Sequence, residues 1–189
     1  MKIYFRKTFK YNPCHSGLSK YESYEAVTRQ QYSPGITNFD SGERFDLRTF
    51  CSSLTRGQQT AERISTVQIV KLDQLREIEF SLHNLVSKEE FESNGSSLVR
   101  ERFIKSFVDD TLLEKRAEIK KRIDEVIEIL LKDKNDKLVI SHSFTMKMFE
   151  AYFKRALDIF ENPILISEVI FPDTETYGFG GGFVVEKSL

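Results

Sequence analysis

The stretch CSSLTRGQQTAERI, residues 51–64, changes its hydrophobic pattern after the first three residues. It overlaps LRTFCS (47–52), an apolar run of the length of a buried strand. Beyond Ser53 the apolar residues recur at helical spacing, at Leu54, Ala61 and Ile64. Ser53 or Thr55 is available to cap that helix. The stretch therefore predicts a strand, a tight loop and a helix.

Strand and helix patterns alternate along the rest of the chain. Further strands are predicted at 2–6, 67–72, 137–141, 164–171 and 182–187. Helices are predicted at 97–132, where the charged residues occupy a face that should be solvated, and at 144–158. This alternation predicts an α/β fold, a three-layer sandwich in which a mostly parallel central sheet has helices on both faces. Residues 13–46 should form a long loop with a short helix. No linker or repeat divides the chain, so we expect a single domain over residues 1–189.

The composition is that of an ordinary globular protein. A chain of 189 residues buries roughly 70% of the surface that it exposes when unfolded, which is enough for one core. The 28 basic and 29 acidic residues nearly cancel, so no global field favours nucleic acid or an anionic membrane. No apolar run resembles a membrane span or a signal peptide, and we expect a cytoplasmic protein. Cys14 and Cys51 lack metal-ligand spacing and should be free thiols.

Polar side chains that can bind anions fall at the ends of predicted strands. These strand ends carry Arg6 with Lys7, Ser52, and His142. In a parallel sheet, ligands bind beyond the carboxyl ends of the strands, so these side chains can converge from distant parts of the sequence. A guanidinium group stays charged and matches the geometry of phosphate, which makes Arg6 a natural anion clamp.

Four stretches resemble, in the expected order, the motifs of the histidine phosphatase superfamily, which has the phosphoglycerate mutase-like fold. SLTRGQQTA (53–61) resembles its Ser-Leu-x-Arg-x-x-Gln-Thr-Ala signature and is the most specific match. KIYFRK (2–7) resembles the first strand with its Arg-His-Gly motif, and LREIEF (75–80) resembles the Leu-Arg-Glu segment. KLVISHS (137–143) resembles the strand that presents the second histidine. Together these stretches imply the same α/β sandwich.

The resemblance implies a role for each matching residue. Arg6, Arg56 and His142 would hold a phosphate group, and Glu77 would protonate the leaving oxygen. Lys7 departs from the family, because it stands where the family has the histidine that accepts the phosphoryl group. An unperturbed lysine, with a pKa of about 10.4, is almost wholly protonated at neutral pH and is a poor nucleophile. Lys7 should therefore bind phosphate rather than accept it.

Three hypotheses of function follow. The first is a degenerate superfamily member that binds a phosphorylated small molecule or phosphoprotein, with phosphoryl transfer lost or strongly reduced, so that its status as an enzyme is uncertain. The second is an active phosphomonoesterase in which Glu77 is the acid and His142, His15 or an activated water is the nucleophile. The third is a structural or interaction protein with a vestigial pocket. No cofactor is implied, and no oligomeric state is indicated.

Other residues with binding chemistry have simpler explanations. Gly178, Gly180, Gly181 and Gly182 lack the flanking strand and helix of a phosphate loop, so they predict a turn between two terminal strands. His83 is expected near the rim of the pocket. Three scattered histidines do not imply a metal site.

Overall fold

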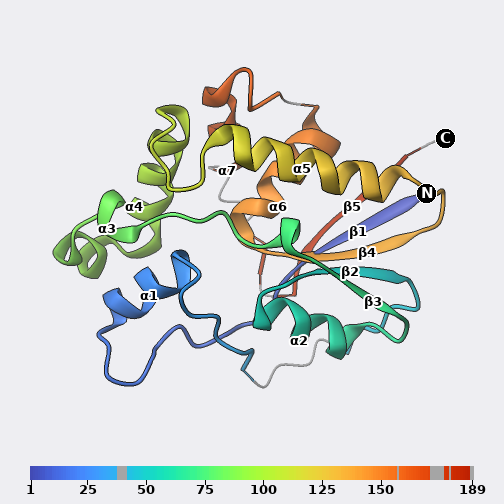
Figure 1. Ribbon diagram of the computed structural model, residues 1–189, viewed down its shortest axis with the longest axis horizontal. Coiled ribbons are helices and arrows are strands. Elements are labelled where there is room, and N and C mark those ends of the chain that lie inside the picture. The colour runs from blue at the N-terminus through green and yellow to red at the C-terminus, as the bar shows by residue number, and fades with distance from the viewer. Residues whose placement is uncertain (38–41, 157, 171–176, 179, 188–189) are drawn as a thin grey trace.

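The computed structural model describes residues 1–37, 42–156, 158–170, 177–178 and 180–187. Its centre is a five-stranded sheet with the order β3-β2-β4-β1-β5 (Figure 1). The strands are β1 (Lys2–Lys7), β2 (Arg48–Ser52), β3 (Ile69–Leu72), β4 (Lys137–Ser141) and β5 (Gly182–Glu186). The first four strands are parallel to one another, and β5 runs antiparallel to β1. The strands predicted at 2–6, 47–52, 67–72, 137–141 and 182–187 are confirmed.

Helices cover both faces of the sheet (Figure 1). Successive side chains of a strand point to opposite faces, and β4 shows this alternation. Leu138 and Ile140 belong to the apolar core shared with α2 (Thr55–Ile64). Val139 belongs to the core shared with α5 (Arg116–Leu131) and α6 (Ser143–Glu150). The predicted α/β sandwich with a mostly parallel sheet is therefore confirmed.

Helix α2 follows β2 after a short loop and approaches the strand very closely. Leu54 is its N-cap residue and no side chain caps it, so the predicted capping by Ser53 or Thr55 is wrong. A Cβ atom at Gly57 would lie only 2.8 Å from the Cβ atom of Ser52. Only glycine permits this approach, which seats the first turn of α2 against the end of β2.

One predicted strand, at 164–171, is wrong. The described part of this segment forms η3, a 3₁₀ turn (Pro163–Ile166), and α7 (Ser167–Ile170), and residue 171 lies outside the described residues. Pro163 occupies the first turn, where its fixed φ and missing N–H favour helical geometry. The β-branched composition of this segment alone therefore predicts the wrong secondary structure. The described glycines before β5 consequently do not connect two strands, and that prediction is wrong as well.

Two predicted helices are divided. The helical pattern at 97–132 belongs to two helices, α4 (Lys88–Val108) and α5, and the turn between them contains Asp110 with φ of 54°. The pattern at 144–158 forms α6 and then η2, a π-helical turn (Ala151–Arg155) that ends at Ala156 with φ of 51°. Residue 157 lies outside the described residues.

Three helices lie beyond the carboxyl ends of the parallel strands (Figure 1). They are α1 (Lys20–Thr28), α3 (Leu82–Leu85) and α4. Helix α1 is the short helix predicted within residues 13–46. Ser19 caps α1 and Ser87 caps α4, each through a capping box. Helix α4 is interrupted at Gly95, where φ of 60° and ψ of −145° are not helical and suit glycine.

The two cysteines are free, as predicted: Cys14 is exposed and Cys51 is buried. Burial raises the pKa of the Cys51 thiol to about 11, so this thiol is protonated at neutral pH and is a poor nucleophile. In the part of the chain that the structure describes, no helix combines the length and the apolar character that crossing a membrane requires.

Candidate functional site

A cavity of about 430 Å³ opens at the carboxyl ends of β1 and β4. Four of the predicted site residues line it: Lys7, Arg56, Glu77 and His142. They come from the end of β1, the first turn of α2, the segment after η1 (Asp73–Leu75), and the end of β4. The cavity has the size of a small-molecule site, roughly 300–1,000 Å³. The fold thus brings together residues that are far apart in the sequence.

Arg56 is the most deeply buried cation of this cavity, with 3% of its surface exposed. Its guanidinium carbon lies 4.8 Å from the centre of the Tyr11 ring. Burial lowers the pKa of Arg56, whereas Tyr11 and Glu77 raise it. Among the described residues, the Nε and Nη1 atoms of Arg56 have no hydrogen-bond partner. A buried guanidinium with unmatched N–H groups is costly, and an anion in the cavity would match them.

His142 follows β4 and is the N-cap residue of α6. Its Nε2 lies 2.8 Å from the Ser52 hydroxyl, and only 2% of the residue is exposed. Burial lowers the pKa of His142 well below its ordinary value, and the positive charges of Arg56, Arg122 and Lys7 add to this effect. The imidazole is therefore neutral at about pH 7. In this state it can offer a hydrogen bond or a lone pair, but no positive charge.

Lys7 is partly buried, and its Nζ donates to the carbonyl oxygen of Tyr177 at 3.4 Å. Burial is the main cause that lowers the pKa of Lys7. The charges of Arg100 and Lys147 lower it further, whereas Glu77 raises it. Because other cations surround it, Lys7 adds to a positive potential that attracts anions into the cavity.

Arg6 is not among the residues that line the cavity. Its Nε donates to Glu43 Oε2 at 3.4 Å, and its guanidinium carbon lies 5.3 Å from the centre of the Phe45 ring. Phe45 packs with the core on the α2 face of the sheet. Neighbouring side chains of a strand point to opposite faces of the sheet, so the Arg6 side chain lies on the α2 face and the Lys7 side chain lies on the other face. The phosphate-binding role of Arg6 stays a prediction.

Glu77 holds the beginning of helix α6. Its carboxylate accepts hydrogen bonds from the backbone N–H groups of Phe144 at 3.2 Å and Thr145 at 2.9 Å. It also accepts one from the N–H of Ile78 at 3.1 Å. The first N–H groups of a helix lack partners within the helix, and a carboxylate there is stabilised by the helix dipole. Glu77 thereby fixes the position of α6, which follows His142 directly.

Residues that the sequence analysis did not select also line the cavity, among them Arg100, Lys147 and Tyr177. Lys147 pairs with the fully buried Glu150 at 2.8 Å, and the Tyr177 hydroxyl donates to the same carboxylate at 2.6 Å. The Lys147 ammonium also lies 4.6 Å from the centre of the Tyr177 ring. Lys147 lies four residues after Ser143, which also lines the cavity, so helical spacing from Ser143 could have indicated it. Nothing in the sequence connects Tyr177 with this site.

The charged face of α5 contains one exception to the predicted solvation. Arg122 is buried, with 7% of its surface exposed, and forms an ion pair with the buried Glu114. Its Nη1 donates to the carbonyl oxygens of Gln74 at 2.7 Å and Arg76 at 3.1 Å. This pair ties the segment that carries Glu77 to helix α5.

Two histidines lie away from the cavity lining. His15 is exposed, and its ring contacts the edge of Tyr32. His83 is exposed, and its Nδ1 lies 3.7 Å from Glu25 Oε1. Neither residue is therefore placed to attack a ligand in the cavity as the structure stands. Among the described residues, no group of three or more His, Cys, Asp and Glu side chains is arranged to hold a metal ion.

Several solved structures share this fold at low sequence identity. Phosphoserine phosphatase from Entamoeba histolytica, in complex with 3-phosphoglyceric acid, matches with a TM-score of 0.57 and 12% identity over 97% of this chain and 88% of that one. A variant of the same enzyme in which a histidine is replaced by alanine, in complex with phosphoserine, matches with a TM-score of 0.55 and 13% identity over the same shares. The product of an open reading frame from Mycobacterium tuberculosis matches with a TM-score of 0.56 and 13% identity, again over 97% and 88%.

The sequence is similar to one protein family. The family model described as "Histidine phosphatase superfamily (branch 1)" matches residues 36–162. A search of curated proteins finds no match. The matched range contains Arg56, Glu77 and His142, and it begins after Lys7. The family match therefore does not test what stands at position 7.

Proposed function

Because this chain belongs to the histidine phosphatase superfamily, we propose that its cavity binds a phosphorylated ligand and that phosphoryl transfer is lost or strongly reduced. The observation that carries the proposal is the buried guanidinium of Arg56, whose Nε and Nη1 lack partners among the described residues. The N–H groups of a guanidinium are charge-assisted donors to phosphate oxygens. A bound phosphate would offset the cost of burying this cation.

Lys7 and His142 would complete the phosphate site. Lys7 contributes positive charge from the end of β1, and His142 contributes a ring nitrogen from the end of β4. A dianionic phosphate favours the protonated form of a lysine beside it, which removes the lone pair needed for attack. Binding and nucleophilic attack are thus opposed at Lys7. This opposition supports a site that holds phosphate without transferring it.

A related fold supports the idea that binding can persist when a histidine is replaced. The Entamoeba histolytica phosphoserine phosphatase holds phosphoserine in a variant with alanine in place of one histidine. For the present chain we propose a small phosphorylated molecule as the ligand, because the site is a cavity among helices. A phosphoprotein would have to present its phosphorylated side chain through the same opening.

The test is isothermal titration with inorganic phosphate. We expect wild-type protein to bind phosphate and Arg56→Gln to bind it at least about tenfold more weakly, since one charge-assisted pair of hydrogen bonds is lost. Arg63→Gln is the matched control, because Arg63 lies on the same helix and is exposed. Wild-type protein that binds no phosphate would contradict the proposal and favour a vestigial pocket. Equal affinities of wild type and Arg56→Gln would exclude Arg56 as the anchor.

A second candidate is an active phosphomonoesterase, and one observation favours it. The buried His142 is kept neutral, so its imidazole retains a lone pair within the cavity. Purified protein would then release phosphate from an aryl phosphate. Arg56→Ala is the control for contaminating phosphatases, because a contaminant is unaffected by this substitution. Release that Arg56→Ala abolishes would replace the first proposal with this one.

A further inference from the structure

The side chains that line the cavity differ in character between its two sides. At the strand ends lies the polar floor, formed by Lys7, Arg56, Glu77 and His142. The lining also contains a surface that we call the apolar wall, formed by Tyr24, Val27, Phe80, Phe91, Val99 and Phe144. The polar Ser96 and Arg100 of α4 line the cavity beside it. The wall residues come from α1, the segment before α3, α4 and α6. A phosphate group alone would leave this wall uncovered.

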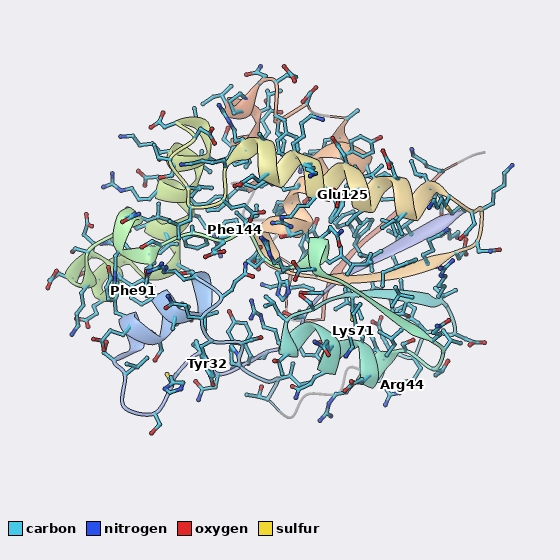
Figure 2. All side chains as sticks on the ribbon, viewed as in Figure 1. Tyr32, Arg44, Lys71, Phe91, Glu125 and Phe144 are labelled. Carbon is cyan, nitrogen blue, oxygen red and sulfur yellow. The ribbon has the colours of Figure 1, made fainter. Side chains whose placement is uncertain are left out.

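Stacked aromatic rings hold the wall in place. The ring of Phe144 stacks on Phe103, with centroids 3.9 Å apart and planes at 9°. Phe80 meets the edge of Phe144 at 5.8 Å, and Tyr24 packs against Phe91 at 5.2 Å. Figure 2 shows Phe144 near the centre of the molecule and Phe91 among the side chains of α1 and α4. The wall is therefore built before any ligand arrives, which lowers the entropic cost of binding.

The described lining residues carry more positive than negative charge, with Lys7, Arg56, Arg100 and Lys147 against Glu77. Glu77 is the one carboxylate among the described lining residues. Both of its oxygens accept backbone N–H groups at the start of α6. Among the described lining residues, an ammonium group on the ligand would have this single carboxylate, which already accepts backbone N–H groups, and would meet the field of Lys7 and Arg56. This disfavours phosphorylated amino acids.

We infer that the ligand is a phosphate monoester whose organic part is uncharged and apolar, with an aromatic ring or a branched hydrocarbon. This inference rests on the proposed phosphate site and extends it to the other side of the cavity. The phosphate lies on the polar floor, and the organic group covers the apolar wall. The phosphate supplies most of the affinity and the orientation, and removing apolar surface from water adds further affinity.

The test compares phosphate esters that differ only in the organic group. Isothermal titration measures the affinities of 1-naphthyl phosphate, methyl phosphate, O-phosphoserine and 3-phosphoglycerate. We expect 1-naphthyl phosphate to bind at least about tenfold more tightly than methyl phosphate, because a buried ring removes far more apolar area from water than a methyl group does. Phosphoserine and 3-phosphoglycerate should bind no more tightly than methyl phosphate. 1-Naphthol, which lacks the phosphate, should bind more weakly than either phosphate ester.

Variants of lining residues measure the contribution of the apolar wall to affinity separately from that of the polar floor. Tyr24→Ser should reduce the preference for 1-naphthyl phosphate over methyl phosphate to below about threefold, because the variant removes part of the apolar wall. Tyr32→Ser is the matched control, because Tyr32 is also half-buried and does not line the cavity. If Tyr24→Ser does not fold, Val99→Thr replaces it, since threonine keeps the shape of valine and adds a hydroxyl to the wall. Val99→Thr should also lower the preference for 1-naphthyl phosphate over methyl phosphate.

Failure of this inference differs from failure of the proposed function. Equal affinity for methyl and 1-naphthyl phosphate would overturn the apolar ligand and leave the phosphate site standing. Tighter binding of 3-phosphoglycerate would also overturn it, and would indicate that Arg100 accepts a second anionic group. Absence of binding for every phosphate, inorganic phosphate included, would overturn both.

Discussion

The Nε2 atom of His142 lies 2.8 Å from the hydroxyl oxygen of Ser52, and both residues are buried at the ends of adjacent strands. The same hydroxyl accepts the backbone N–H of Leu54 at 3.2 Å. Ser52 thus links the histidine to the loop that leads into α2. The orientation of His142 depends on a residue that lies outside the Ser-Leu-x-Arg motif by one position.

Ser52→Ala tests this link. Removing the hydroxyl leaves a buried ring nitrogen and a backbone N–H without their partner, so we expect the free energy of unfolding to fall by about 1–3 kcal/mol. Urea denaturation measures it. Ser53→Ala is the control, because Ser53 donates to Asp73 in an exposed hydrogen bond and should change stability by less than about 1 kcal/mol. Equal losses in both variants would contradict a special role of Ser52.

His142 should make stability depend on pH. Its pKa is lowered in the folded state by burial, so below about pH 6.5 the unfolded chain binds a proton there that the folded chain does not. The free energy of unfolding therefore decreases as the pH falls, by up to about 1.4 kcal/mol per pH unit from this group.

Urea denaturation between about pH 5 and pH 7.5 measures this dependence. His142→Gln should show a shallower decrease than wild type. His83→Gln, which changes an exposed histidine, should keep the wild-type decrease. Parallel curves for wild type and His142→Gln would show that the buried imidazole does not govern the pH dependence.

Lys7 should make anion binding depend on pH at the alkaline end. Burial lowers the pKa of Lys7 below its ordinary value of 10.5. Sulfate, which does not titrate in this range, should therefore bind more weakly as the pH rises through the pKa of Lys7. Lys7→Arg keeps its charge and should retain sulfate affinity over the same range. Isothermal titration at increasing pH checks this, and a fall of equal size in Lys7→Arg would mean that another group loses its proton.

Lys7→His should raise phosphoryl transfer above the wild-type rate. An imidazole is partly neutral at about pH 7 and can attack phosphorus, whereas a lysine beside a phosphate is favoured in its protonated form, which has no lone pair. The measurement is phosphate release from p-nitrophenyl phosphate above the wild-type rate. The double variant Lys7→His/Arg56→Ala should release none. No gain in Lys7→His would show that a histidine at position 7 is not sufficient for phosphoryl transfer in this cavity.

Gly57→Ala tests the close approach of α2 to β2. A Cβ atom there would lie 2.8 Å from the Ser52 Cβ and 3.1 Å from the Ser52 carbonyl oxygen. Because the backbone must shift, we expect a loss of about 1–3 kcal/mol in the free energy of unfolding and weaker phosphate binding, since Arg56 precedes Gly57. Gly178→Ala is the control, because no heavy atom of the described residues lies within 4 Å of its added Cβ. A fully stable Gly57→Ala would contradict this packing argument.

The sequence predicted the sheet well because each of the five confirmed strands is a short apolar run with polar residues at its end. It failed at 164–171, where the apolar content favoured a strand but Pro163 began a helical turn. It also treated 97–132 as one helix, because helical periodicity continues on both sides of the turn at Asp110. Periodicity reports which residues are apolar. It does not report where the chain reverses.

The fold brings four of the five predicted site residues to one cavity, and the different position of the fifth, Arg6, has a physical reason. Lys7, Arg56, Glu77 and His142 line one cavity, but Arg6 does not. Alternation along a strand already implied that Arg6 and Lys7 point to opposite faces. Lys147 and Tyr177 could not be assigned in the same way, because their contacts depend on tertiary packing around Glu150.

The partners of Lys7 have a consequence for the synthesis of the chain. Its backbone N–H donates to Gly181 at 2.8 Å, and its Nζ donates to Tyr177, 170 residues further along the sequence. A ribosome adds roughly 5–20 residues per second, so Tyr177 is synthesised roughly 10–30 s after Lys7. Once β4 (Lys137–Ser141) has been made and has paired with β1, β1 still has an open edge on its other side, where β5 later pairs. The nascent chain therefore exposes an unpaired strand edge beside its incomplete cavity. Such an edge can pair with another chain and aggregate unless a chaperone binds it first.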